Sequence, residues 1–261
     1  MKAAVIEQYG TPEVFEIKNI PEPKIQKPDD VLIQVYASGI NPIDWKTRKG
    51  NLKYLLRARF PIVLGYDASG IVIETGPKVT KFKKGDKVYA RLDRKFGQAL
   101  AEYAIGSERT FAKIPEYLSF EEAAAIPLAS LTAYQGLFEK GRLKNNEQIL
   151  INGASGGVGH FALQFAKNAG AKVTATCSKR HWDMIASFNP DETIDYQAQD
   201  FKKMPAKYDV IFDAVGKENF LRVKHVLKPG GRYITTLPRP KILFHLIVSL
   251  FTRKKVNSLL M

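Results

Sequence analysis

Residues 146–167 read NEQILINGASGGVGHFALQFAK, and this stretch decides the fold of the second half of the chain. Ile149, Leu150 and Ile151 predict a strand that runs into a glycine-rich turn over 153–159, and apolar positions at helical spacing follow at once. Glycine adopts positive φ at little cost, so the turn can be sharp and a ligand can approach its backbone. The free N–H groups of the following helical turn point toward an anion. We therefore predict a strand–turn–helix unit that binds a pyrophosphate.

The turn follows the spacing G-x-G-x-x-G, with Ala154 in the first glycine position. An ordinary tight turn between a strand and a helix can show the same spacing, so the interpretation depends on the flanking strand and helix. Glycine at 156 and 157 would admit a phosphate, and glycine at 159 would let the helix lie close to the strand. The residues expected to contact the pyrophosphate are Ala154, Ser155, Gly156, Gly157, Val158 and Gly159.

Strand and helix patterns alternate around and after this turn. A helix over 130–140 is expected before the glycine strand. The further expected elements are strands over 172–176, 193–195, 208–212 and 232–236 and helices over 181–188 and 218–227. This alternation predicts an α/β fold with a doubly wound parallel sheet.

The first 120 residues show a different pattern, in which short apolar strands are separated by glycine and proline turns. The strands expected here cover 3–6, 31–38, 70–75 and 87–92. They predict a mostly antiparallel β domain. Ser119 and Glu122 have the spacing of a capping box ahead of a helix over 121–126. We therefore divide the chain into a β domain, residues 1–120, and a dinucleotide-binding domain, residues 121–261.

The composition fits one large or two modest globular domains, since 45% of the 261 residues are hydrophobic and 25% are charged. The single cysteine excludes a disulfide framework and a cysteine-rich zinc lobe. The N-terminal segment MKAAVIEQYG has no features of a targeting peptide. The longest apolar run, 242–251, is interrupted by His245 and is too short to span a bilayer. We therefore expect a cytoplasmic protein.

The net charge of +14 is unevenly distributed. Residues 201–261 hold 13 Lys and Arg against 3 Asp and Glu, a balance of +10, whereas residues 101–200 hold 9 against 12, a balance of −3. Such a basic segment can attract an anionic cofactor, an acidic membrane surface or nucleic acid, and it can also be a solvated surface. No nucleic-acid-binding motif accompanies the charge.

The residues after the second strand of a dinucleotide-binding unit contact the adenosine ribose. An acidic residue there selects NAD, whereas basic and hydroxyl groups accept the 2′-phosphate of NADP. Here Cys177, Ser178, Lys179 and Arg180 follow the strand, and none of them is acidic. A basic loop without a ligand would look similar, but cations at a helix start are disfavoured unless an anion joins them. We therefore predict NADPH as the cofactor, with Ser178 donating to the phosphate and Lys179 and Arg180 supplying charge.

The ends of the fourth and fifth strands complete the predicted cofactor crevice, because ligands of open parallel sheets bind beyond the carboxyl ends of the strands. Val215, Gly216 and Leu237 follow these two strands. We expect them near the nicotinamide half of the cofactor.

Further motifs accompany the glycine turn along the whole chain. They are Asn41-Pro42-Ile43-Asp44-Trp45-Lys46, Gly65-Tyr66-Asp67-Ala68-Ser69-Gly70, Lys84-Gly85-Asp86-Lys87-Val88, Glu121-Glu122-Ala123-Ala124 and Leu131-Thr132-Ala133. With them the chain resembles the medium-chain dehydrogenase/reductase family, in its zinc-free quinone oxidoreductase (zeta-crystallin-like) branch, close to the plant alkenal reductases. The resemblance implies a GroES-like catalytic domain ahead of a Rossmann domain, and a homodimer that pairs through the edge strand. It also implies hydride transfer from NADPH to a quinone or an α,β-unsaturated carbonyl compound.

The residues at two positions indicate whether the chain can bind zinc. Zinc alcohol dehydrogenases of this superfamily have Cys where Asn41 stands and Gly-His-Glu where Gly65-Tyr66-Asp67 stands. Zn²⁺ prefers thiolate and imidazole ligands, which these positions lack. We therefore predict no metal, and without a Lewis acid the acceptor must itself be electrophilic, as quinones and enones are.

Three residues are candidate catalytic groups. Asn41 could bind the substrate oxygen or the nicotinamide ribose. Tyr54 and Tyr66 could stack on a flat acceptor or donate a hydrogen bond to the developing oxyanion, and a half-buried packing role is an equal alternative for both.

Three further cofactor contacts are expected in matching loops. Lys46 would contact the cofactor by resemblance, although by charge alone it could pair with Asp44. Thr132 would hydrogen-bond the carboxamide region, and Tyr196 would lie by the adenosine phosphate or cap a turn.

Family members continue well past the equivalent of Met261, so we expect a C-terminally shortened version of the fold, in which cofactor binding is better supported than activity. A second hypothesis is a non-catalytic cofactor-binding protein whose basic surface contacts RNA or a membrane. Salt-sensitive binding to nucleic acid or anionic vesicles, with no NADPH oxidation by quinones or enones, would favour it.

Overall fold

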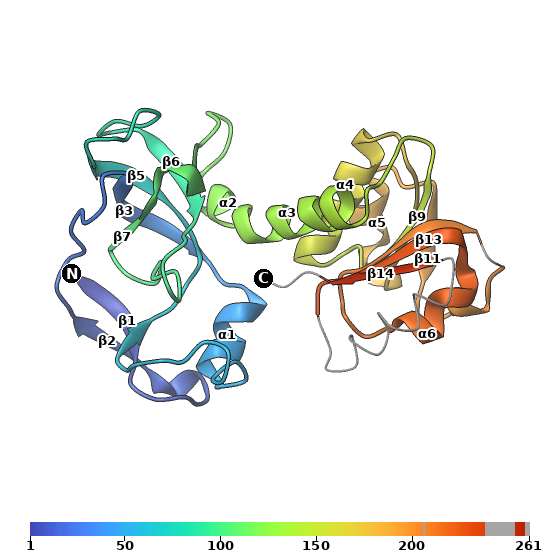
Figure 1. Ribbon diagram of the computed structural model, residues 1–261, viewed down its shortest axis with the longest axis horizontal. Coiled ribbons are helices and arrows are strands. Elements are labelled where there is room, and N and C mark those ends of the chain that lie inside the picture. Colours follow the sequence, from blue (N-terminus) through green and yellow to red (C-terminus); the bar gives the residue numbers. More distant parts are fainter. Residues whose placement is uncertain (206, 238–253, 259–261) are drawn as a thin grey trace. The chain divides into compact units, whose positions relative to one another are not determined.

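The computed structural model describes residues 1–205, 207–237 and 254–258, and the chain divides into two compact units, Met1–Leu128 and Ala129–Met261 (Figure 1). Helix α2 (Phe120–Ala124) belongs with the first unit because it packs on strands of that unit. The backbone N–H of Leu128 also donates to Asp67 in the first unit.

The first unit is built from two antiparallel sheets, which confirms the predicted β domain. One sheet has the strand order β2-β1-β4 and the other the order β7-β3-β5-β6-β8. The strands are β1 (Lys2–Ile6), β2 (Phe15–Asn19), β3 (Asp30–Gly39), β4 (Ile62–Val63), β5 (Asp67–Thr75), β6 (Lys87–Arg91), β7 (Tyr103–Ser107) and β8 (Phe111–Lys113).

Alternation along β3 builds the core of the five-stranded sheet. Val31 and Ile33 are fully buried in a cluster with Val72 and Val88 of the neighbouring strands. Glycine is required where β5 crosses β3, because a Cβ at Gly70 would lie 1.9 Å from the backbone oxygen of Gln34.

The helices of the first unit are short: η1 (Pro12–Val14), α1 (Pro42–Arg48), η2 (Glu108–Thr110) and α2. The seven residues of α1 are too few for periodicity to predict it, but Asn41 caps it and Asp44 accepts the Asn41 N–H at 2.7 Å. The capping box predicted at α2 is confirmed, since Ser119 N–H donates to Glu122 at 2.8 Å and Glu122 N–H donates to Ser119 Oγ at 3.1 Å.

The second unit contains a six-stranded sheet with the order β11-β10-β9-β12-β13-β14. Every neighbouring pair is parallel. The strands are β9 (Gln148–Asn152), β10 (Lys172–Cys177), β11 (Glu192–Asp195), β12 (Tyr208–Asp213), β13 (Leu227–Thr235) and β14 (Lys255–Ser258). Counted from β9, this is the order 3-2-1-4-5-6 of a Rossmann sheet, so the predicted doubly wound fold is confirmed.

Both faces of this sheet are covered. Ile149 and Ile151 of β9 lie in one buried cluster with Leu163 of α4 (Gly157–Asn168). Leu150 lies in a second cluster with Phe220 of α6 (Phe220–Val223). Successive side chains of one strand therefore enter two cores, as a doubly wound sheet requires.

Helix α3 (Pro127–Tyr134) begins in the last two residues of the first unit and continues into the second. The remaining helical segments of the second unit are η3 (Gln135–Lys140), η4 (Lys179–His181), α5 (Trp182–Ala186), η5 (Phe201–Lys203) and η6 (Lys224–Val226). The helix predicted over 130–140 is α-helical only to Tyr134 and continues as the π-helical η3. The helix predicted over 218–227 begins later, because the Asn219 side chain caps it by accepting the Arg222 N–H at 3.2 Å.

Within the described ranges, no helix combines the length and the apolar character needed to cross a bilayer.

Candidate functional site

The glycine turn joins the carboxyl end of β9 to the start of α4. Gly153 has φ of +80°, and the Ala154 N–H donates to the Thr176 backbone oxygen of β10 at 2.9 Å. Gly156 is the N-cap residue of α4, so Ser155 to Gly159 span the entry into the helix. All six residues predicted to contact a pyrophosphate therefore lie at the carboxyl edge of the sheet.

The glycines of the turn have different roles. A Cβ at Gly159 would lie 2.1 Å from the Gly153 oxygen, so only glycine lets α4 approach the strand so closely. A Cβ at Gly157 would meet nothing within 4 Å, and one at Gly156 would meet only the Gly153 oxygen at 3.4 Å. The surface over Gly156 and Gly157 is therefore open to a ligand, whereas Gly159 is needed for packing.

The start of α4 offers backbone donors beside this open surface. The first helical hydrogen bond runs from the His160 N–H to the Gly156 oxygen at 3.0 Å. The N–H groups of Gly157, Val158 and Gly159 precede it, and they lie at the positive end of the helix. This geometry fits an anion such as a pyrophosphate.

A cavity of about 260 Å³ lies beyond the end of β10, lined by Ser178, Arg180, Tyr196 and Gln197. Three of these residues are ones for which the sequence predicts contact with the adenosine end of the cofactor. Lys179 is exposed beside them. Ser178 Oγ also lies 3.2 Å from His181 Nδ1, so the hydroxyl is oriented by a local contact.

Cys177 lies behind this cavity with its side chain buried in the core. Burial raises the pKa of its thiol. Its backbone oxygen accepts the Tyr196 N–H at 3.3 Å, which ties the loop after β11 to the end of β10. The structure thus gives Cys177 a backbone contact with a wall of the cavity.

The residues predicted near the nicotinamide lie on two adjoining loops. Val215 is partly exposed, and the N–H groups of Val215 and Gly216 donate to Asp213 Oδ1 at 3.2 and 3.0 Å. Thr236 Oγ1 donates to the Ala214 oxygen at 3.2 Å, and the Leu237 N–H donates to Thr235 Oγ1 at 3.3 Å. The loops after β12 and β13 therefore meet at the carboxyl edge of the sheet. Thr132, the remaining predicted contact in this unit, is a buried residue of α3.

Asp213 is a residue of this edge that the sequence prediction missed. Its carboxylate is fully buried and accepts hydrogen bonds from Asn152 Nδ2 at 2.9 Å and the Tyr233 hydroxyl at 3.0 Å, in addition to backbone donors. Burial, and secondarily the Asp213 charge, raise the pKa of the Tyr233 phenol. The signal in the sequence is an acidic residue that directly follows the apolar run Val210-Ile211-Phe212 at the end of the strand.

In the first unit, Asn41 is held by two carboxylates. Its side-chain Nδ2 donates to Asp67 Oδ2 at 2.9 Å, and its backbone N–H donates to Asp44. Asp67 also accepts the Leu128 N–H at 3.1 Å. Burial raises the pKa of Asp67 to about 7 and that of Asp44 to about 6, against the effect of these hydrogen bonds. The amide of Asn41 is therefore oriented by a buried, titratable partner.

The other predicted residues of the first unit have different environments. Tyr66 is 8% exposed, with the Arg91 guanidinium 5.3 Å from its ring centroid, and burial raises its pKa. Tyr54 is 86% exposed, with the Lys53 ammonium 5.0 Å from its ring. The Lys46 ammonium lies 5.5 Å from the Trp45 ring. Asn41 and Tyr66 flank the Asp44–Asp67 region, whereas Tyr54 is a surface residue.

Two family models match the chain. The alcohol dehydrogenase GroES-like domain matches residues 27–128, and the zinc-binding dehydrogenase model matches residues 157–255. The chloroplastic quinone-oxidoreductase homolog of Spinacia oleracea is 38% identical over 230 residues, which cover 85% of this chain and 69% of that protein. The chain belongs to the medium-chain dehydrogenase/reductase family, in its quinone oxidoreductase branch.

Two further members of the family are similar to this chain over most of its length. The chloroplastic NADPH-dependent alkenal/one oxidoreductase of Arabidopsis thaliana is 38% identical over 244 residues, which cover 90% of this chain and 62% of that protein. The quinone oxidoreductase structure from Coxiella burnetii is 34% identical, covers the whole chain and 82% of its own, and superposes with a TM-score of 0.89. The chain thus spans about two thirds of the lengths of these two curated relatives.

The donor atoms around Asn41 do not suit the zinc ion that one of the two family descriptions names. Asn41 supplies an amide that is hydrogen-bonded to Asp67, and Tyr66 supplies a phenol, where zinc prefers thiolate and imidazole. In the part of the chain that the structure describes, no group of three or more His, Cys, Asp or Glu is arranged to hold a metal ion.

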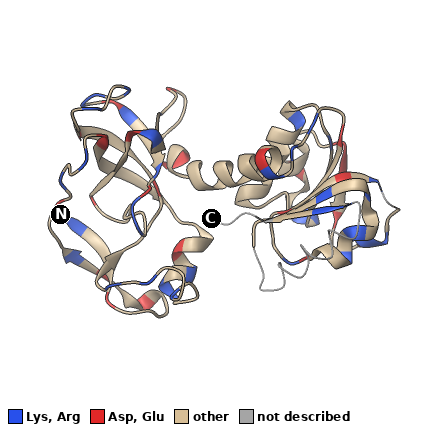
Figure 2. Cartoon of the chain, in the orientation of Figure 1, with Lys and Arg blue, Asp and Glu red and all other residues tan. Residues whose placement is uncertain are grey.

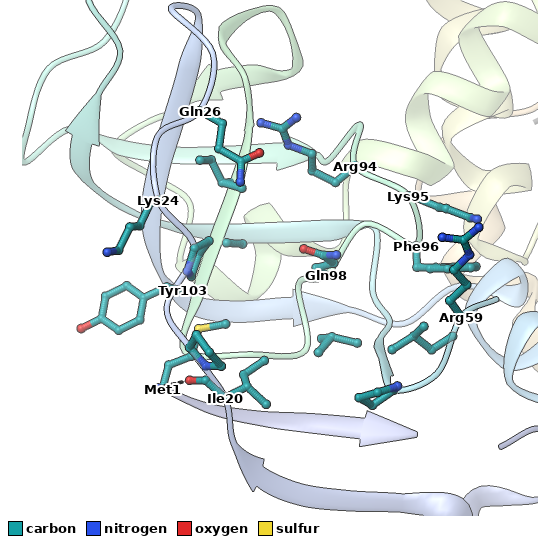
Figure 3. A pocket seen from close by; sticks show the side chains of 17 residues that line it. Met1, Ile20, Lys24, Gln26, Arg59, Arg94, Lys95, Phe96, Gln98 and Tyr103 are labelled. Carbon is teal, nitrogen blue, oxygen red and sulfur yellow. Dashed lines mark hydrogen bonds between the residues drawn. The ribbon is translucent and has the colours of Figure 1, made fainter. Parts of the chain in front are cut away.

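A cavity of about 600 Å³ lies in the first unit of this dehydrogenase/reductase (Figure 3). Its floor includes Ile62, Val63 and Phe96, and its cationic lining residues are Lys24, Arg59, Arg94 and Lys95. One of these charges is already compensated, because Arg94 pairs with the buried Asp30 at 2.5 Å. None of the predicted site residues lines this cavity, so it is separate from the cofactor and catalytic candidates.

Lys and Arg residues occur along both units, with Asp and Glu residues among them (Figure 2). Several cations of the basic C-terminal third are neutralised by acids. Lys202 pairs with Asp200 and Glu218, Lys228 with Asp209, and Arg232 with Glu147, at 2.5 to 3.0 Å. These pairs reduce the positive field that binding of RNA or a membrane would use.

Proposed function

We propose that this chain is an NADPH-dependent, zinc-independent oxidoreductase that transfers hydride to a quinone or an α,β-unsaturated carbonyl compound. The observation that carries the proposal is the open glycine turn at the start of α4 beside an acid-free cavity at the end of β10. These two features accept the pyrophosphate and the 2′-phosphate of one dinucleotide.

The cofactor would be held by residues of the second unit. The N–H groups after Gly156 would bind the pyrophosphate, and Ser178, Lys179, Arg180 and Tyr196 the adenosine end. Val215, Gly216 and Leu237 would line the nicotinamide half, with Thr132 at the carboxamide. NADPH supplies the hydride from its nicotinamide ring when bound, and the protein supplies position and a dry site.

The acceptor would be handled by residues of the first unit. Asn41, oriented by Asp67, would bind the substrate oxygen or the nicotinamide ribose. Tyr66 would donate to the developing oxyanion, and the exposed Tyr54 would stack on a flat acceptor. Lys46 would contact the cofactor. Without a Lewis acid, only an acceptor that is already electrophilic reacts.

The proposal is tested by following NADPH absorbance in the presence of quinones, enones and 2-alkenals. Consumption with one of these classes and not with simple ketones supports the proposal and identifies the substrate class. Gly157→Glu is the matched control, because the open space over Gly157 admits the side chain but its charge occupies the pyrophosphate position. Absence of turnover with every class, although the chain binds NADPH, would contradict the proposed activity.

The choice of NADPH over NADH has its own test. We expect Lys179→Ala combined with Arg180→Ala to lower kcat/KM for NADPH about 100-fold, because charge-assisted bonds to the 2′-phosphate are lost. NADH has no such phosphate, so its kcat/KM should stay within about threefold. Lys172→Ala, an exposed cation of the same unit, is the control. An unchanged preference for NADPH would show that Lys179 and Arg180 do not recognise the 2′-phosphate.

A homodimer and a cytoplasmic location are the further expectations from the sequence. Sedimentation of the purified chain tests the first, and imaging of a tagged full-length protein tests the second. The alternative of RNA or membrane association predicts salt-sensitive binding to RNA or anionic vesicles.

A further inference from the structure

The carboxylate of Asp213 accepts hydrogen bonds from three segments of the second unit: the end of β9, the loop after β12, and β13. Oδ1 accepts from Asn152 Nδ2 at 2.9 Å and from the N–H groups of Val215 and Gly216 at 3.2 and 3.0 Å. Oδ2 accepts from the Glu218 N–H at 3.1 Å and from the Tyr233 hydroxyl at 3.0 Å. Two oxygens thus receive five hydrogen bonds while the residue is fully buried.

Only a carboxylate fits this set of donors. An ionised Asp is purely an acceptor, with about four lone-pair directions on its two oxygens. An Asn at the same place has one acceptor oxygen, and its NH₂ group would face N–H and O–H donors. The identity of residue 213 is therefore dictated by what surrounds it.

The network continues from Asp213 to the glycine turn. Asn152 Oδ1 accepts the Thr176 hydroxyl at 2.9 Å, and Thr176 Oγ1 accepts the Gly153 N–H at 3.0 Å. The path runs across the adjacent ends of β12, β9 and β10. It ends at the first residue of the turn that faces the pyrophosphate.

The other end of the network is the loop over 214–216. Two of its three N–H groups bond to Asp213, and the Val215 side chain packs over the turn: a Cβ at Gly153 would lie 2.2 Å from Val215 Cγ2. The Asp213 carboxylate and the Val215 side chain therefore help to fix this loop relative to the glycine turn, together with the Ala214 N–H, which donates to the Asn152 backbone oxygen at 3.1 Å.

We propose that Asp213 is a positioning residue for the nicotinamide half of the dinucleotide. It acts through Asn152 and Thr176 on the glycine turn and through the backbone on Val215 and Gly216. This inference rests on the proposed function, since it assumes that NADP(H) occupies the turn. It predicts that the network matters most for the nicotinamide half of the ligand and less for the adenosine end.

The test compares two ligands, NADP⁺ and 2′,5′-ADP, by calorimetry on the full chain. 2′,5′-ADP contains the adenosine and both its phosphates but lacks the nicotinamide half. We expect Asn152→Ala, which disconnects Asp213 from the turn, to weaken NADP⁺ binding about tenfold and 2′,5′-ADP binding less than twofold. Asp213→Asn should show the same selectivity with a larger loss.

Two further variants keep the test decisive if Asp213→Asn does not fold. Tyr233→Phe removes one donor from Asp213 and leaves the path to the turn intact, so we expect a smaller selective loss of NADP⁺ binding, about threefold. Tyr208→Phe removes a buried hydroxyl from the same sheet without touching Asp213 and should change neither affinity.

The outcomes separate this inference from the proposed function. If the unmodified chain binds neither ligand, the proposed function fails. If it binds both and Asn152→Ala binds both as before, or loses both equally, the positioning role fails while the function stands. Selective loss of NADP⁺ binding supports the role.

Discussion

Each unit has a buried carboxylate beside its candidate site, and the two are satisfied very differently. Asp213 in the second unit accepts five hydrogen bonds from three segments. Asp67 in the first unit accepts from Asn41 and Leu128, and burial raises its pKa to about 7. The difference teaches that burial alone does not decide what a carboxylate does. Many donors make it part of the scaffold, whereas few donors leave it able to change its protonation near neutral pH.

Asp213→Asn should give the largest effect. The substitution leaves buried backbone donors unsatisfied and sets an amide against the Tyr233 hydroxyl, at an expected cost of about 4 kcal/mol in the free energy of unfolding. Thermal and denaturant unfolding of the full chain measure this cost. A loss of less than about 1 kcal/mol in the free energy of unfolding would show that the five hydrogen bonds of Asp213 do not stabilise the fold more than the few bonds of Asp67 do.

A comparison of Gly159→Ala with Gly157→Ala tests whether the second unit tolerates an added methyl group at the packed position and at the open position of the glycine turn. At Gly159 the new methyl would lie 2.1 Å from the Gly153 oxygen, so we expect a loss of about 3 kcal/mol. At Gly157 the methyl meets nothing, so stability should change by less than about 1 kcal/mol while NADP⁺ binding weakens. Equal destabilisation by both would contradict the division of roles between the glycines.

Asp67→Asn tests the titratable carboxylate. Because the folded pKa of Asp67 is raised above its ordinary value, the folded state holds an extra proton between about pH 4 and 7, and stability falls as pH rises through this window. We expect the first unit to lose about 2 kcal/mol between pH 5 and 8, and the variant to lose clearly less. Asp44, with a pKa raised to about 6, contributes a remaining slope at lower pH. Parallel pH profiles for the two proteins would refute the assignment.

Asn41→Ala should give the smallest effect. It removes one donor from Asp67, so we expect a loss of about 1 kcal/mol and a shift of the Asp67 transition to higher pH. The measurement is the midpoint of the stability–pH curve, with Gln34→Ala, at an exposed position of the neighbouring strand β3, as the control. A midpoint that moves to lower pH would show that the Asn41 amide does not stabilise the ionised form.

Local patterns in the sequence predicted the parts of the fold that depend on neighbouring residues. The glycine turn, the strands around it, four of the strands of the first unit and the Ser119 cap follow from residues only a few positions apart. Strands β2, β4, β7 and β8 were not predicted. Helix boundaries were less predictable where a side chain intervened, as at Asn219, or where the helix changed type after Tyr134.

The partners of the two buried carboxylates were not predictable in this way. Asn152 is 61 positions from Asp213, and Leu128 is 61 positions from Asp67. Such pairs form only when strands far apart in the chain become neighbours, so periodicity carries no signal of them. The acidic residue after the apolar run of β12 shows where a buried carboxylate lies, but the sequence does not show which groups donate hydrogen bonds to it.

Cys177 gives the chain an internal chemical reporter. Its thiol is the only one in the sequence, is 1% exposed and has a pKa raised by burial, so a thiol reagent reaches it only when the end of β10 opens. The rate of labelling in the unmodified protein therefore counts opening events at this one strand end. Measuring the labelling rate of Cys177 at increasing concentrations of NADPH or 2′,5′-ADP would show how much the bound adenosine end reduces opening of this strand end, without any engineered label.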